Sequence, residues 1–156
     1  MKCIWSLFLV LATGGVNAGD GFPATCNPVA VQKESLVLKT KQAQVVLIHN
    51  VSTSDLWITH PVKDPGASAG WSSHIEADNW SALVVDKDTF ELNCIESKPG
   101  HEQQVPCVGL ISACEWPDVK IPADPKGTFW AGENLAMQTL TAQLGGHGYG
   151  LPVSKN

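Results

Sequence analysis

The feature that most constrains the fold is a series of short apolar or alternating segments separated by turn residues. Residues 35–40 (SLVLKT) alternate apolar and polar side chains, residues 44–50 (QVVLIHN) are more continuously apolar, and residues 55–60 (DLWITH) end before Pro61. Further strands are expected at 71–76, 80–86, 88–95, 105–115 and 127–131. Short segments with turn signals about every 8–12 residues are typical of antiparallel strands.

This pattern predicts a mostly β protein, an antiparallel β-sandwich of immunoglobulin-like or cupredoxin-like type. A small α+β sheet is the alternative, and no βαβ rhythm indicates a parallel sheet. One C-terminal helix is expected over residues 133–144 (ENLAMQTLTAQL), with Leu135, Leu140 and Leu144 on its apolar side. Gly145-Gly146 should end the helix, and the glycine-rich tail behind it is expected to be loose.

The N-terminus has the pattern of a signal peptide. Met1-Lys2 is basic, residues 3–12 are an apolar run too short for a membrane span, and Val16 and Ala18 place small residues before Gly19. The sequence therefore predicts a signal peptide over residues 1–18, cleaved after Ala18, and a single β-sandwich domain over 19–156. No second long apolar stretch follows, so no membrane span is expected in the mature chain. The predicted location is periplasmic or secreted.

The charge balance argues against nucleic-acid binding. The chain has 10 basic residues, all lysine, against 15 acidic residues, and no arginine. Removal of residues 1–18 takes away Lys2 alone, which leaves a net charge of about −6. Nucleic-acid binders need a basic surface and commonly use arginine.

Four cysteines remain after the predicted leader: Cys26, Cys94, Cys107 and Cys114. In an exported protein an even number favours disulfides, and three connectivities are possible. If residues 88–95 and 105–115 form a hairpin that is symmetric about Pro99-Gly100, Cys94 faces Cys107, which leaves Cys26 to pair with Cys114. Metal binding by cysteine is the rival interpretation, but no C-x-x-C is present.

Tryptophans and histidines supply the candidate surface. Trp57 and Trp130 lie within apolar segments and are expected in the core, whereas Trp71, Trp80 and Trp116 border loops. Trp71, His74 and Trp80 are the candidate binding patch, because an indole offers a large contact area at little entropy cost. Packing at the ends of the sandwich is the competing interpretation. No metal site is predicted, with His60 and His74 as a weak alternative pair.

No catalytic residue is predicted. Ser68 lies in a G-x-S-x-G match, but the match falls in a proline-bounded loop rather than at a strand-to-helix turn. The carboxylates Glu76, Asp78 and Asp86 have no spacing that identifies an acid–base pair. Asn50 and Asn79 begin N-glycosylation sequons, which carry meaning only in a glycosylating host.

Several strings resemble a known family. They are LIHNVSTSDLWITHP, DPGASAGWSSHI, NWSALVVD, LNCIESKPGHEQQVPCVGLISACEW and GTFWAGENL, and together they span most of residues 47–135. They are similar to the B member of the enhanced-entry proteins, small exported proteins of intracellular Gram-negative bacteria. The resemblance implies a role in entry into host cells and implies no catalytic residue.

The sequence therefore predicts an exported, non-enzymatic protein that acts through its surface in host-cell entry or envelope function. Its expected partner is a protein or an envelope or host-surface component, and no cofactor is expected. The alternative is a small periplasmic metal-binding protein or envelope hydrolase that uses His60, His74 and nearby carboxylates.

Overall fold

The computed structural model describes residues 21–61, 72–86, 89–123 and 130–152. Within these ranges the chain forms ten strands and one helix, α1 (Met137–Gly146). The strands are β1 (Asn27–Val29), β2 (Ser35–Leu38), β3 (Gln44–Asn50), β4 (Leu56–Thr59), β5 (Ser72–Ile75), β6 (Trp80–Val85), β7 (Phe90–Glu96), β8 (Gln103–Val105), β9 (Ile111–Trp116) and β10 (Trp130–Leu135). The predicted signal peptide lies outside the described residues.

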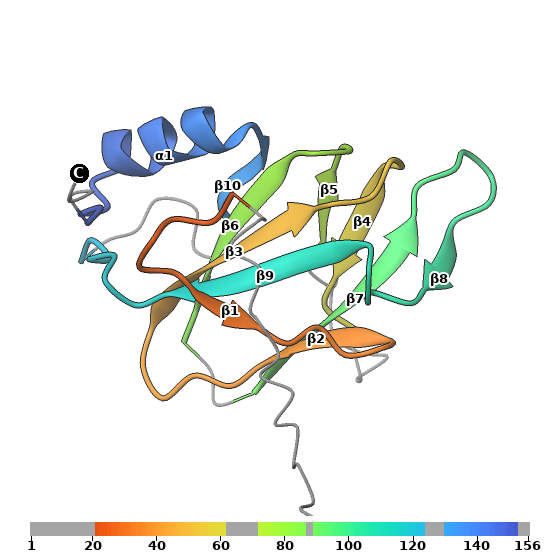
Figure 1. Ribbon diagram of the computed structural model, residues 1–156, viewed down its shortest axis with the longest axis horizontal. Coiled ribbons are helices and arrows are strands. Elements are labelled where there is room, and N and C mark those ends of the chain that lie inside the picture. Colours follow the sequence, from red (N-terminus) through yellow and green to blue (C-terminus); the bar gives the residue numbers. More distant parts are fainter. Residues whose placement is uncertain (1–20, 62–71, 87–88, 124–129, 153–156) are drawn as a thin grey trace, which may run out of the picture.

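The strands form two sheets, with antiparallel pairing between the neighbouring strands (Figure 1). The first sheet has the order β1-β9-β3-β6-β10, and the second has the order β2-β7-β4-β5, with β8 also paired to β7. The prediction of a mostly β, antiparallel sandwich with one C-terminal helix is confirmed. Among the described residues, no helix is long and apolar enough to cross a membrane.

One hydrophobic core lies between the two sheets. Alternate residues of each strand point into it, such as Val46 and Ile48 of β3 and Leu56 and Ile58 of β4. The intervening residues of β3, Val45 and Leu47, are also fully buried. They belong to a second core on the opposite face of the first sheet. Burial on both faces explains why the segment of β3 is apolar without alternation.

The second core is closed by α1, which packs against β10 and β6 (Figure 1). Leu140 and Leu144 are fully buried, as their spacing predicts. Burial of a leucine side chain contributes about 1.5–3 kcal/mol. The approach of helix to sheet depends on Gly132, because a Cβ at that position would overlap Leu140 Cδ1.

The predicted start of the helix is wrong. Residues 133–135 belong to β10, where Leu135 lies opposite Trp80 of β6. Pairing with β6 outweighs the helical preference of Glu133 and Leu135, and Asn134 adopts a left-handed φ of 51° at an irregularity in the register.

The described part of the tail, residues 147–152, packs against the rest of the fold, contrary to the expectation of a loose segment. Tyr149 is buried in the second core. Gly150 and Lys120 exchange two backbone hydrogen bonds of 2.9 Å. The Tyr149 hydroxyl has no hydrogen-bond partner among the described residues, and burial raises the pKa of this side chain above its ordinary value.

Both predicted disulfides are present, Cys26–Cys114 and Cys94–Cys107. However, the symmetric hairpin from which the Cys94–Cys107 disulfide was predicted is not present. Cys94 lies opposite Val105, and residues 105–115 divide between β8 in the second sheet and β9 in the first. The chain changes sheets at the turn 107–110, where Gly109 has a φ of 79° that glycine adopts readily. Two disulfides are consistent with an oxidising, extracytoplasmic compartment.

Candidate functional site

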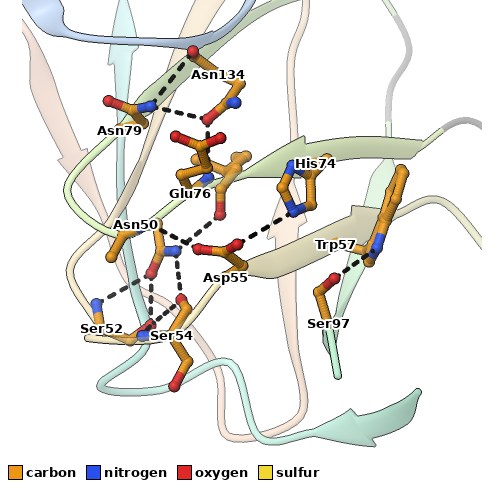
Figure 2. A network of polar contacts seen from close by, with 12 residues as sticks. Asn50, Ser52, Ser54, Asp55, Trp57, His74, Glu76, Asn79, Ser97 and Asn134 are labelled. Carbon is orange, nitrogen blue, oxygen red and sulfur yellow. Dashed lines mark hydrogen bonds and ion pairs between the residues drawn. The ribbon is translucent and has the colours of Figure 1, made fainter. Parts of the chain in front are cut away.

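A polar network occupies one end of the sandwich, where the β3–β4 loop meets the β5–β6 turn and β10 (Figure 2). Its centre is Asn50, the last residue of β3, which is fully buried. The Asn50 amide donates to the carbonyl oxygens of Ser54 at 2.8 Å and Ile75 at 2.9 Å. Its oxygen accepts from the backbone N–H of Ser52 at 3.0 Å and from the Ser52 hydroxyl at 2.7 Å. The donor and acceptor capacity of the amide is therefore satisfied.

This network leaves neither sequon asparagine available as a free amide. The Asn50 side chain is buried with both of its donors engaged. Asn79 donates to the side-chain oxygen of Asn134 at 2.9 Å, and the same oxygen accepts from the Glu76 backbone N–H at 2.8 Å. In this structure the two asparagines connect the β3–β4 loop, β5 and β10.

A second group of contacts extends from the network onto the outer face of the second sheet (Figure 2). Asp55 accepts from the Ala77 backbone N–H at 3.3 Å and lies 3.6 Å from His74 Nε2. The rings of His74 and Trp57 are 5.1 Å apart, and the Trp57 indole donates to the Ser97 hydroxyl at 3.1 Å. The indole ring is thus held by contacts on two sides.

The expectation that Trp57 belongs to the core is wrong. Its side chain is at the outer face and the residue is 36% exposed, whereas its neighbours Leu56 and Ile58 are buried. Strict alternation in β4 explains this arrangement, because no described segment covers the outer face of the second sheet at Trp57. Trp130 is half-buried and packs against the core, which agrees better with the expectation that it is a core residue.

The predicted patch of Trp71, His74 and Trp80 does not form one exposed surface in the described part of the chain. Trp71 lies outside the described residues, and His74 is half-buried on the outer face. Trp80 is only 4% exposed, because Phe22 packs edge-on at 5.2 Å and His49 stacks at 3.9 Å. The expectation that Trp80 is exposed is therefore wrong.

Trp116, also expected at a loop border, is buried in the second core. Its indole donates to the Thr25 hydroxyl at 3.0 Å. Sequence position at a strand end did not reveal that the N-terminal segment, α1 and the tail cover this face of the first sheet.

The weak alternative of a two-histidine metal site receives no geometric support. The His60 ring stacks on the core residue Phe90 at 4.2 Å, and its Nδ1 lies 2.7 Å from the Glu91 carbonyl. His74 packs instead on the outward Trp57. No cluster of three or more potential metal ligands occurs in the described ranges. Ser68 lies outside those ranges.

A cleft of about 430 Å³ adjoins the network, and we call it the loop cleft. It is lined by Ser52, Thr53, Ser54, Leu56, Glu96, Val105, Pro106, Val108 and Leu110. One wall is the β3–β4 loop, which the Asn50 amide holds. The other is the segment 105–110, which the Cys94–Cys107 disulfide attaches to β7. The Val51 N–H donates to the Leu110 carbonyl at 3.0 Å and joins the two walls.

Sequence reasoning missed the residues that build this end of the molecule. Asn50 begins a glycosylation sequon. An Asn-x-Ser-x-Ser run at the end of a buried strand also indicates an asparagine side chain that forms hydrogen bonds with the backbone of the following loop. The alternation in residues 56–59 could have identified Trp57 as outward facing.

No protein-family model, curated protein or solved structure matches this chain. The resemblance to enhanced-entry proteins therefore stays a prediction.

Proposed function

We propose that the protein is an exported, non-enzymatic binding protein that acts through the loop cleft. The observation that carries this proposal is a cleft with both walls already held in place. A preformed site avoids part of the ordering cost of binding, and about 430 Å³ falls within the usual range of ligand sites.

The lining of the cleft favours an apolar group of a larger partner. Leu56 is buried beneath it, whereas Val108 at its edge is 52% exposed. Complete burial of a fully exposed valine contributes about 1.5–3 kcal/mol, so burial of the half-exposed Val108 contributes roughly half of that. The exposed Thr53 borders the apolar surface, and its hydroxyl supplies a position for an orienting hydrogen bond. We expect a protein partner in the envelope or on a host surface.

Export and the biological role are parts of the same proposal. The N-terminal pattern of residues 1–18 and the two disulfides support a periplasmic or secreted location. The resemblance to the enhanced-entry proteins supports a role in host-cell entry or envelope function.

The alternative, a small metal-binding protein or envelope hydrolase, would use His74 and the nearby Asp55, which lie 3.6 Å apart. Elemental analysis of the purified protein separates the two proposals. A stoichiometric metal that is lost in a His74→Ala variant would support the alternative.

Site-specific photo-cross-linking tests the proposed binding role. A photoreactive side chain is placed at Val108, in the cleft, and in a matched protein at Gln138, which is exposed on α1. After incubation with envelope and host-surface fractions, we expect a discrete adduct from position 108 that position 138 does not give. Equal labelling from both positions, or none from 108, would contradict the proposal.

A further inference from the structure

The outer face of the second sheet carries a row of side chains around Trp57. The strand register places His74 of β5 opposite Trp57 of β4, Trp57 opposite Ile95 of β7, and Ile95 opposite Gln104 of β8. Directly opposed residues have Cβ atoms roughly 5 Å apart, so these four positions span about 15 Å. A second row, Ser72, Thr59 and Asn93, lies beside the first. We call these seven residues the Trp57 face.

The Trp57 ring is already oriented. Its N–H is donated to Ser97 Oγ at 3.1 Å, and the His74 ring lies 5.1 Å away. His74 is in turn 3.6 Å from Asp55, which accepts from the Ala77 N–H. The Trp57 side chain has therefore already lost much of its rotamer freedom in the free protein. Stacking of a ligand on the indole costs little further side-chain entropy.

The charges around Trp57 favour a neutral ligand. Two carboxylates at the ends of these strands are engaged, Asp55 with His74 and Ala77, and Glu96 with Lys98. Glu91 points to the same face, but it lies four residues before Ile95 on β7, about 13 Å from the Trp57 row. The strand positions of the Trp57 face carry no lysine, and the chain has no arginine. Among the described residues, neither a cation nor an anion therefore finds a free charge partner at the strand positions beside the indole.

The remaining groups have the chemistry that a sugar needs. An indole offers an apolar surface against which the C–H groups of a sugar ring can pack. Thr59, Asn93 and Gln104 supply hydroxyl and amide groups that can both donate and accept hydrogen bonds with sugar hydroxyls. We propose that the Trp57 face binds a neutral hexopyranose ring, stacked on Trp57. This site is separate from the loop cleft, and the proposal does not depend on it.

Nuclear magnetic resonance of the ¹⁵N-labelled, disulfide-bonded protein tests this proposal. The probes are methyl β-D-glucopyranoside, methyl β-D-galactopyranoside, methyl α-D-mannopyranoside and N,N′-diacetylchitobiose, with tetramethylammonium as a cationic comparison. At least one sugar should shift the Trp57 indole signal in a saturable way, with a dissociation constant on the order of 1 mM. If tetramethylammonium alone saturates the signal, or no sugar shifts it, the proposal is wrong.

Variants then assign the site. Trp57→Ala should weaken sugar binding by about tenfold or more, monitored by the signals of Asn93 and Gln104, whereas Gln138→Ala on α1 should leave it unchanged. Ser97→Ala releases the indole N–H and should weaken binding severalfold, and Ser97→Thr should restore it. Undiminished binding in Trp57→Ala would overturn the proposal.

Discussion

Replacement of Asn50 is the most informative perturbation of the polar network, because its side chain contacts both the β3–β4 loop and β5. Asn50→Ala removes four hydrogen bonds and leaves the Ile75 carbonyl without its side-chain donor. The carbonyl of Ser54 and the N–H of Ser52 are partly exposed and can recover bonds to water. Counting about 1 kcal/mol for the lost bond to the Ser52 hydroxyl and about 1–3 kcal/mol for the unsatisfied Ile75 carbonyl gives a loss of ~2–4 kcal/mol.

Asn50→Asp sharpens the test because it keeps the shape of the side chain. The introduced oxygen would face the carbonyls of Ser54 and Ile75 at 2.8 and 2.9 Å. Burial beside these oxygens raises the pKa of the new carboxyl above about 3.9, so the folded state binds its proton more tightly than the unfolded state. The variant should therefore be least stable at neutral pH and should recover as the pH falls towards 4.

Urea unfolding with the disulfides intact measures both effects. For a domain of this size, the loss in Asn50→Ala corresponds to a melting temperature roughly 10 °C lower. The control is Asn93→Asp, at a half-buried outward position of β7, where we expect a change within about 0.5 kcal/mol. If Asn50→Ala costs less than about 1 kcal/mol, or if Asn50→Asp gains nothing on acidification, the network does not hold the loop as argued.

Three further predictions concern the disulfides, the helix contact and the tail. Removal of the Cys94–Cys107 disulfide should cost about 3 kcal/mol by loop entropy, and removal of Cys26–Cys114, whose cysteines are 88 residues apart, should cost roughly 4–5 kcal/mol. Thermal unfolding of the two double serine variants measures both costs. Equal costs would argue against an entropic origin. Gly132→Ala should destabilise the protein by about 1–3 kcal/mol, because the new Cβ overlaps Leu140. Gly145→Ala has open space around it and should stabilise α1 by up to about 1 kcal/mol. Urea unfolding should therefore show changes of opposite sign for the two variants. Tyr149→Phe should be neutral or stabilising because the buried hydroxyl has no partner among the described residues. Since burial raises the pKa of Tyr149 above 10.0, the wild-type protein should lose more stability than the variant as the pH rises above that value.

Local pattern was sufficient to predict most strands of this fold. The continuous apolar run at residues 44–50 corresponds to β3 with the same bounds, because a strand buried on both faces has few polar positions to confuse the pattern. The cysteine pairing was also predicted correctly, although the hairpin behind it was not. Cys107 follows β8 by two residues, so the disulfide does not connect directly opposed positions.

The failures arose where distant segments determine the environment. Trp80 resembles a loop-border residue in sequence, but Phe22 and His49 cover it from elsewhere in the chain. Trp57 resembles a core residue, but the second sheet has no layer over its outer face among the described residues. The sequon at Asn50 does not indicate its structural role, because only the fold reveals that the Ile75 carbonyl lies within hydrogen-bond distance of its side chain. Of the two described members of the predicted patch, His74 lies on the outer face and Trp80 is buried.

Native-state hydrogen exchange of the two cleft walls tests the central claim of a preformed binding cleft most directly. The Val51 N–H is bonded to the Leu110 carbonyl and the Ser52 N–H to the Asn50 side chain. If the cleft is preformed, both amides should exchange nearly as slowly as those of β3, through openings close to global unfolding. Exchange of both amides at the rate of an unstructured loop would contradict the claim.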